Sequence, residues 1–268
     1  MRYNKDFNLK KYNSFKLESY AKEIYFPETI TDLQAVLVLL RNKKFKILAG
    51  GTNVILRPEI DCVLSLDKMP QKINFYDGAT IVTARVPTIS FILEAIKNNI
   101  IGIEGLIGIP GTIGGAIVMN AGSGKYTISD YLLAVTTMNL EGNIRVYQSP
   151  DLEFGRRYSI LQEKKEILID AVFDFKHGFP NQEEIDKAKA HRKTIPHYPS
   201  AGGIFKNWHS LKPYAEKLIG LRVGDAEVSE SINIIVNKKN ATFEDIMTLI
   251  EKISYIVRKP LELEVKIL

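Results

Sequence analysis

GIEGLIGIPGTIGGAIVMNAGSGK, residues 102–125, is the stretch of sequence that decides the fold. It contains eight of the chain's 18 glycines. Glycine permits positive φ and lets a backbone come close to a ligand. The residues between the glycines are mostly apolar, so the stretch should be buried, and its N–H and C=O groups then need partners. A bound phosphate joined to a flat ring would supply them. An irregular crossover in the core, without a ligand, is the alternative.

Another glycine turn lies earlier in the chain, and it is the first of the two. Phe45–Ala49 is predicted to be a buried strand, and it ends in Gly50-Gly51-Thr52-Asn53. Such turns expose backbone N–H groups that can bind phosphate oxygens. Two phosphate-binding turns in successive αβ units suit one long cofactor with a pyrophosphate.

Composition excludes several classes of protein. The chain has 268 residues, of which 45% are hydrophobic and 25% charged, as in soluble globular proteins. The net charge of +5 comes from scattered basic residues, which argues against nucleic acid as a partner and is compatible with small anions. Cys62 is the one cysteine and is expected to be a small buried hydrophobe. No segment reaches about 18 uninterrupted apolar residues and the N-terminus has no apolar leader, so a cytoplasmic protein is expected.

Known catalytic and nucleotide-binding motifs are largely absent. There is no G-x-G-x-x-G between a strand and a helix and no G-x-S-x-G elbow. Gly124-Lys125 lacks the preceding Gly and the following Ser or Thr of a P-loop. The four histidines have no metal-ligand spacing and are expected at the surface, so no metal site is predicted: His177, His191, His197 and His209.

Periodicity indicates mixed helices and strands. A helix is expected to open at Thr31, with Gln34 completing a capping box, and another to open at Thr242. A hairpin is expected around Glu141-Gly142-Asn143. The other expected elements are the strands Val63–Leu66, Thr80–Val86, Ile167–Phe175, Ile232–Val236 and Leu261–Ile267, and the helices Ile89–Asn98 and Asn181–Thr194.

One family resembles this chain along nearly its whole length. Residues 105–116 with Asn120-Ala121-Gly122 look like the flavin-binding core of the UDP-N-acetylenolpyruvoylglucosamine reductase (MurB) family, and the shorter type II form fits best. Six further segments, in the family's order, resemble its motifs: 12–15 (YNSF), 50–53 (GGTN), 154–159 (FGRRYS), 199–207 (PSAGGIFKN), 228–229 with 234–237, and 261–267 (LELEVKI).

The resemblance implies an α+β fold in three parts. Residues 1–66 and 67–178 would form the two subdomains of an FAD-binding domain of the vanillyl-alcohol-oxidase type. Residues 179–268 would form an α+β substrate domain, whose last strand can return to the first subdomain.

The resemblance also implies the reaction. In this family NADPH reduces FAD, and the hydride then passes to the enolpyruvyl group of UDP-N-acetylglucosamine enolpyruvate. The product, UDP-N-acetylmuramate, is a precursor of peptidoglycan, which links the activity to cell wall biogenesis, cell shape, the cell cycle and cell division. A monomer is expected, with neither nucleic acid nor a membrane as a partner.

Site residues follow from the matching motifs. The resemblance implies that Arg157 would be the arginine that stabilises the enolate and that Glu264 would be the catalytic glutamate. Lys206 and Asn207 are expected near the substrate's diphosphate. The FAD-binding residues would be Gly50, Gly51, Thr52, Asn53, Gly108, Ile109, Pro110, Gly111, Thr112, Gly114, Gly115, Asn120, Ala121 and Gly122.

Two residues depart from the family's pattern. Gly203 stands where the family has the serine that donates a proton, and this departure bears on catalysis. Arg156 stands where the family usually has tyrosine. A water, another hydroxyl, or a much slower second half-reaction are the possible consequences. Two alternatives therefore stay open: a catalytically impaired homologue that binds FAD or a UDP-sugar, and a flavin oxidoreductase of the same fold with another substrate.

Overall fold

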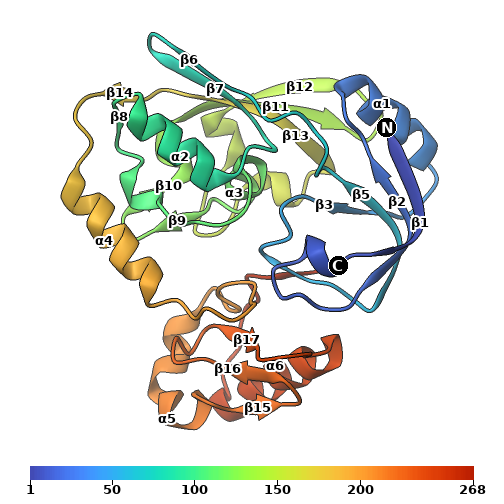
Figure 1. The fold of residues 1–268 in the computed structure, drawn as a ribbon, viewed down its shortest axis with the longest axis vertical. Coiled ribbons are helices and arrows are strands. Elements are labelled where there is room, and N and C mark those ends of the chain that lie inside the picture. Colours follow the sequence, from blue (N-terminus) through green and yellow to red (C-terminus); the bar gives the residue numbers. More distant parts are fainter. The chain divides into compact units, whose positions relative to one another are not determined.

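The computed structural model describes residues 1–268, and the chain forms two compact units (Figure 1). The first unit contains Met1–Tyr3, Tyr25–Gly50 and Leu64–Arg192. The second contains Asn4–Ile24, Gly51–Val63 and Lys193–Leu268. None of the helices combines the length and the apolar character that a membrane span needs.

The largest sheet lies in the first unit and has the strand order β12-β11-β13-β7-β6. Every neighbouring pair in it is antiparallel, as expected for an α+β protein. The predicted hairpin is confirmed, with Gly142 at a φ of 85° in its turn. The strands are β6 (Ile73–Tyr76), β7 (Ala79–Thr83), β11 (Leu132–Asn139), β12 (Ile144–Gln148) and β13 (Glu166–Phe173).

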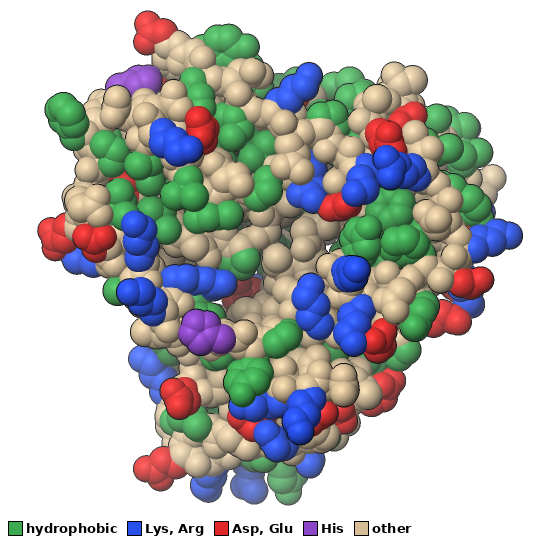
Figure 2. All heavy atoms as spheres, viewed as in Figure 1, with side chains coloured by type: hydrophobic (Ala, Val, Ile, Leu, Met, Phe, Trp, Pro, Cys, Tyr) green, Lys and Arg blue, Asp and Glu red, His purple; other side chains and the backbone are tan.

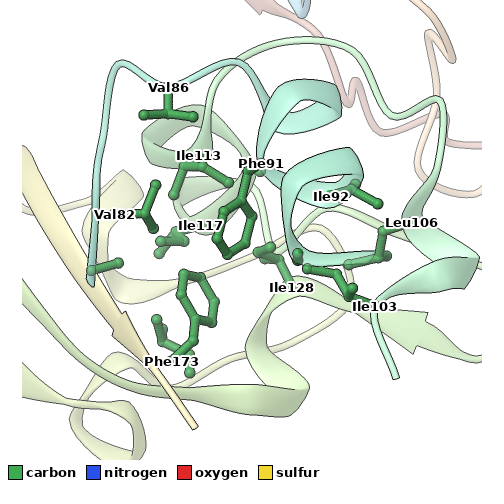
Figure 3. Packing of buried hydrophobic residues seen from close by; sticks show 14 of the residues in the cluster. Val82, Val86, Phe91, Ile92, Ile103, Leu106, Ile113, Ile117, Ile128 and Phe173 are labelled. Atoms are coloured by element: carbon green, nitrogen blue, oxygen red, sulfur yellow. The ribbon is translucent and has the colours of Figure 1, made fainter. Parts of the chain in front are cut away.

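Two helices supply much of the core of this unit. They are α2 (Thr88–Lys97) and α3 (Ile113–Val118). Phe91 of α2 and Phe173 of β13 are fully buried, with their ring centroids 5.4 Å apart. Figure 3 shows Ile113 and Ile117 of α3 directed into the same cluster. Burial of such side chains stabilises the unit by about 1.5–3 kcal/mol each.

The N-terminal sheet has the strand order β1-β2-β5-β3. Its strands are β1 (Arg2–Asn8), β2 (Tyr20–Phe26), β3 (Lys46–Leu48) and β5 (Glu59–Ser65). The helix α1 (Ile30–Leu40) follows β2. The predicted capping box was wrong by two residues, because Thr29 is the N-cap and accepts from the N–H of Asp32 at 3.0 Å. The side chain of Gln34 instead donates to the carbonyl of Gly142 at 3.2 Å.

The second unit is built on the sheet β15-β16-β17 and the helix α6 (Phe243–Val257). Thr242 caps α6 through a capping box with Asp245, so the prediction that Thr242 opens this helix is confirmed. Apolar side chains of α6 join a core that includes Phe15 and Phe205. The other elements are β4 (Val54–Ile55), α5 (Ala215–Leu218), β15 (Arg222–Val223), β16 (Ala226–Val228), β17 (Ile235–Asn237) and β18 (Lys266–Ile267).

Short elements connect these parts. The charged helix predicted before Pro196 is α4 (Gln182–Lys193). The remaining strands are β8 (Ile100–Ile101), β9 (Gly122–Ser123), β10 (Tyr126–Thr127) and β14 (Lys176–His177). The 3₁₀ turns are η1 (Lys10–Tyr12), η2 (Glu104–Leu106), η3 (Ile128–Tyr131), η4 (Ser149–Leu152), η5 (Ile160–Gln162) and η6 (Trp208–Tyr214).

Two predicted strands are shorter than expected. Of the predicted strand Leu261–Ile267, only β18 is formed. Pro260 precedes this segment, and Leu263 forms only an isolated bridge to Phe205. Ile232–Val236 was wrong in its first part, since a turn closed by the bond from Ile234 N to Ser231 O precedes β17.

The exposure of the histidines and of the cysteine agrees with the sequence expectations. All four histidines are exposed, and Cys62 is buried with a free thiol. On the face drawn in Figure 2, Lys and Arg side chains are interspersed with Asp and Glu.

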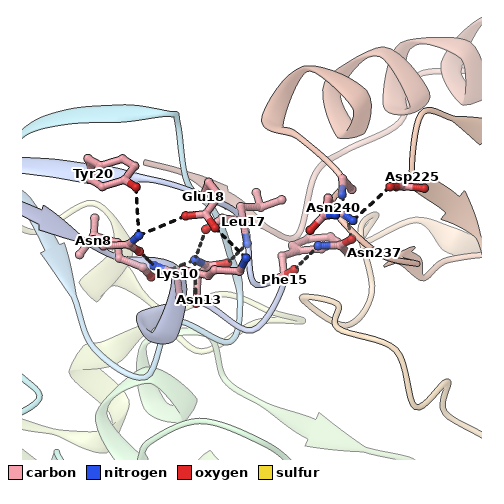
Figure 4. A network of polar contacts seen from close by, with 12 residues as sticks. Asn8, Lys10, Asn13, Phe15, Leu17, Glu18, Tyr20, Asp225, Asn237 and Asn240 are labelled. Carbon is pink, nitrogen blue, oxygen red and sulfur yellow. Dashed lines mark hydrogen bonds and ion pairs between the residues drawn. The ribbon is translucent and has the colours of Figure 1, made fainter.

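Two asparagines tie together distant segments of the second unit. Asn13 folds its own loop, since its amide donates to Leu9 O at 3.0 Å and its Oδ1 accepts from Leu17 N at 2.9 Å. The amide of Asn237 donates to Phe15 O at 2.9 Å, and its Oδ1 accepts from Ala241 N at 2.8 Å. Figure 4 shows these contacts side by side. The segments 12–15 (YNSF) and 234–237 therefore meet. Asn237 satisfies backbone groups that would otherwise be buried without partners.

Asn237→Ala should lower the free energy of unfolding by about 2–3 kcal/mol, because buried backbone groups lose their partner. Urea unfolding followed by circular dichroism measures this. Asn240→Ala is the control, since Asn240 is exposed, and it should change stability by less than about 0.5 kcal/mol. Equal losses in the two variants would contradict the role given to Asn237.

Candidate flavin and substrate site

The two glycine turns approach each other through their backbones. A Cβ on Gly50 would lie 3.2 Å from Cα of Gly111 and 3.4 Å from Cγ2 of Thr112. Gly111 has a φ of 104°, a conformation that favours glycine. The carbonyl of Gly111 accepts from Thr88 N at 3.0 Å, which fixes the turn against α2. A side chain at Gly50 would fill the space where the backbones meet.

Both turns offer backbone N–H groups that no protein acceptor uses. In the first turn these are the N–H groups of Gly51, Thr52 and Asn53. In the second turn they are those of Gly111 and Thr112. By contrast, the N–H groups of the helix that follows are already bonded. Neutral donors of this kind, in either turn, are suited to phosphate oxygens.

Gly51 cannot be any other residue without rebuilding the turn. Its φ is 64°, and a Cβ on it would lie 1.9 Å from the carbonyl oxygen of Tyr12. Ser14 N donates to Gly51 O at 3.0 Å. The N-terminal Y-N-S-F segment therefore lies directly against the first glycine turn within the second unit.

Two buried polar atoms in the first unit have no partner. They are Oγ1 of Thr88, whose backbone holds Gly111, and Oδ1 of Asn120. Asn120 is 6% exposed and its amide donates to Gly155 O at 2.9 Å. Unpaired buried polar atoms are rare and costly. Their position in the glycine stretch and beside the Gly111 turn fits a bound cofactor that carries both donors and acceptors, as FAD does.

Arg157 is held by the glycine stretch. Its Nη2 donates to Gly122 O at 2.8 Å and its Nη1 to Asn120 O at 3.5 Å. The residue has a φ of 55°, in a tight turn closed by two bonds between Gly155 and Tyr158. A non-glycine residue in this conformation is strained, so surrounding contacts must hold it. Arg156, its neighbour, is exposed.

Tyr158 is a poor proton donor in this turn. Its hydroxyl donates to Glu163 Oε1 at 2.6 Å, and this bond raises the pKa of Tyr158 to about 12.

Gly203 and Glu264 lie together in the second unit. Residues 203–206 run beside residues 262–264, with bonds from Glu264 N to Ile204 O and from Lys206 N to Glu262 O, each of 2.8 Å. A Cβ on Gly203 would lie 3.7 Å from Oε2 of Glu264 and 2.8 Å from Nδ2 of Asn233. No hydroxyl lies nearer to this point than those atoms.

Asn233 was missed by the sequence reasoning. Its Oδ1 accepts from Phe205 N at 2.9 Å and its Nδ2 donates to Phe205 O at 3.0 Å. The carboxamide is therefore fixed in the space beside Gly203. No motif in the sequence marks Asn233, because its role depends on the residue that it lies against.

Lys206 and Asn207 lie on the same short segment. Lys206 Nζ pairs with Glu262 Oε1 at 2.5 Å. The side chain of Asn207 donates to Pro260 O at 2.8 Å and accepts from Glu262 N at 3.0 Å. It therefore holds the segment that leads to Glu264.

Lys266 is a second cation that the sequence reasoning left out. Its backbone N–H donates to Asn53 O at 3.0 Å, while Asn53 Nδ2 donates to Glu264 O at 3.2 Å. The pKa of Lys266 is lowered, first by burial and second by the charge of Lys206, while Glu262 opposes both. Strand alternation from Glu264 would have been the signal to find it.

Matches to known proteins agree with this geometry. Residues 21–147 match the model of an FAD binding domain, and residues 194–268 match the model of the UDP-N-acetylenolpyruvoylglucosamine reductase C-terminal domain. The fold and the glycine turns thus define an FAD-dependent oxidoreductase.

Relatives along the whole chain give the family. A UDP-N-acetylenolpyruvoylglucosamine reductase of Caldanaerobacter subterraneus subsp. tengcongensis is 34% identical, covering 96% of this chain and 89% of the relative. One from Francisella tularensis is 31% identical, covering 91% of each. The crystal structure of the Thermus caldophilus enzyme (MurB) has a TM-score of 0.84 and 28% identity, covering 100% of this chain and 99% of its own. The chain belongs to the UDP-N-acetylenolpyruvoylglucosamine reductase family.

Gly51→Ala should destabilise the protein more than Gly78→Ala. Both glycines have positive φ, 64° and 74°, but nothing lies within 4 Å of a Cβ on Gly78. The conformational cost alone is about 1 kcal/mol; the clash with Tyr12 O should bring Gly51→Ala to about 3 kcal/mol or more. Urea unfolding of the two variants compares them. A loss no larger than that of Gly78→Ala would show that the first turn can move away from Tyr12.

Proposed function

We propose that this protein reduces the enolpyruvyl double bond of UDP-N-acetylglucosamine enolpyruvate to give UDP-N-acetylmuramate. Its reductants would be FAD and NADPH. The observation that carries the proposal is the C-terminal unit, which matches the reductase-specific model and holds Glu264 beside residue 203. A flavin oxidoreductase with another substrate would not need that unit.

Bound FAD, reduced by NADPH, would supply the hydride for one carbon of the double bond. Negative charge would then develop on the adjacent carbon and on its carboxylate. Arg157 is the residue we assign to this charge, because a guanidinium donates to a carboxylate through two parallel bonds. Its bonds to Gly122 O and Asn120 O preorganise it, so little rearrangement is needed as the charge forms.

The proton for the adjacent carbon must come from near residue 203. Glu264 Oε2 and the Asn233 amide are the polar groups beside that position. An amide does not donate its proton to carbon, so we assign proton donation to Glu264, either directly or through a water. A positioned general acid typically contributes ~10²–10⁴-fold.

The substrate's diphosphate needs positive charge. We assign Lys206 to it, where Glu262 would be exchanged for phosphate oxygens. For Asn207 we propose a supporting role, since its side chain is engaged with the backbone of residues 260 and 262. The FAD-binding residues remain those of the two glycine turns together with Asn120, Ala121 and Gly122.

The cellular setting follows from the substrate. We place the enzyme in the cytoplasm as a monomer, without nucleic acid or membrane partners, where it would serve peptidoglycan synthesis and through it cell shape and division. Residues 1–66 and 67–178 would act as the two FAD-binding subdomains and residues 179–268 as the substrate domain.

A catalytically impaired homologue is the second candidate, and Gly203 is the observation that favours it. Such a protein would bind FAD and the UDP-sugar but turn over slowly. The two candidates differ in one rate, that of oxidation of the reduced flavin by the enolpyruvyl substrate.

The purified protein with FAD should consume NADPH in the presence of UDP-N-acetylglucosamine enolpyruvate. Glu264→Gln should slow oxidation of the reduced flavin by ~10²–10⁴-fold and leave its reduction by NADPH unchanged. Stopped-flow absorbance separates the two half-reactions.

Glu251→Gln is the matched control, because Glu251 is exposed on α6 of the same unit and has no part in the proposed site. It should leave flavin oxidation within a few fold. FAD binding and NADPH oxidation without any dependence on the substrate would favour the impaired homologue.

Gly203→Ser should accelerate oxidation of the flavin by the substrate, and the gain should be larger when Asn233→Ala accompanies it. The serine Cβ would otherwise lie 2.8 Å from Asn233 Nδ2, a contact that forces the amide off Phe205. We expect the double variant to be roughly 10-fold faster or more, as a restored general acid would allow.

Asn233→Ala alone is the control and should give no gain. If neither serine variant is faster than the natural protein, the missing hydroxyl does not limit the rate.

A further inference from the structure

We propose that Arg192 is a cofactor-binding residue whose guanidinium binds the diphosphate of FAD. The inference rests on the FAD-binding function given above. It concerns a residue of the charged helix α4 that no sequence motif marks.

The side chain of Arg192 lies directly on the second glycine turn. A Cβ on Gly108 would be 3.2 Å from both Cγ and Cδ of Arg192 and 3.4 Å from its Cβ. The stem of the arginine thus covers Gly108 along most of its length. Gly108 has a φ of 86°, so the turn itself favours glycine there, and the absence of a side chain lets the arginine lie close.

The charge of Arg192 is not used within the protein. The side chain forms no ion pair, although it is the basic group that lies on this turn. Two other cations of the same unit are engaged, since Arg85 pairs with Asp67 and Lys125 lies 4.0 Å from Glu184. An unpaired arginine beside a turn that exposes N–H groups is suited to a phosphate.

The backbone groups of the turns are neutral, whereas the diphosphate of FAD is anionic. N–H groups of Gly111 and Thr112 can donate hydrogen bonds but cannot balance this charge. A guanidinium supplies both hydrogen bonds and positive charge, because its fork matches two phosphate oxygens and arginine side chains keep their charge in proteins. Arg192 therefore completes the chemistry that the glycine turns begin.

A purely structural role is the alternative, in which the stem shields the turn and the charge is solvated. Arg192→Met tests this, because methionine keeps an unbranched apolar stem and removes the charge. Arg192→Lys keeps the charge without the fork. Lys189→Met removes one positive charge from the same helix without contact to Gly108 and is the matched control.

The measurement is the dissociation constant of each apoprotein for FAD and for riboflavin, followed by flavin fluorescence. Riboflavin has the ring but no phosphate. Arg192→Met should weaken FAD binding roughly 10- to 100-fold, as expected when a hydrogen bond to a charged group is lost. Riboflavin binding should stay within about threefold, and Arg192→Lys should fall between the natural protein and Arg192→Met.

Three results would overturn the proposal while leaving FAD binding by the natural protein intact. They are unchanged FAD affinity in Arg192→Met, an equal loss for FAD and riboflavin, and an equal loss in Lys189→Met. Failure of the natural protein to bind FAD would instead contradict the proposed function itself.

Discussion

Gly50 and Gly111 bring two turns from distant parts of the sequence within one van der Waals contact, 3.2 Å from a would-be Cβ to Cα. A Cβ on Gly50 would meet the backbone of Gly111. The N–H groups of Gly111 and Thr112 have no acceptor within the protein. Thr88 fixes this turn through Gly111 O, and the stretch that begins there continues to Asn120 and Gly122, which hold Arg157. The Gly111 turn and Arg157 are therefore linked by one stretch of chain within the first unit.

In the second unit, asparagine side chains fix the backbone around Gly203 and Glu264. Asn207 and Asn233 both use their carboxamides on backbone, and together they hold the two segments that place Glu264 beside Gly203. Loss of the serine hydroxyl at residue 203 leaves a carboxylate and an amide there. An ionised carboxylate has no proton to give, so the route proposed above needs Glu264 in its protonated form.

Sequence patterns predicted the parts of this molecule that depend on local physics. The hairpin at Gly142, the capped helix after Thr242 and the helix before Pro196 follow from turn residues, capping and periodicity. The strand at residues 261–267 was overestimated because its alternation reflects one buried residue, Val265, and not a full ladder. Motif resemblance placed Arg157 and Glu264. Arg192 and Asn233 escaped because their importance comes from which glycine they lie against, and that is a property of tertiary structure alone.

The most direct test of this account is a crystal structure of the protein with FAD. It should place the diphosphate about 2.7–3.2 Å from the N–H groups of Gly111 and Thr112. The isoalloxazine ring should then lie toward Asn120 and Arg157. A diphosphate bound elsewhere, with those N–H groups facing water, would contradict the central claim that the Gly111 turn binds the cofactor.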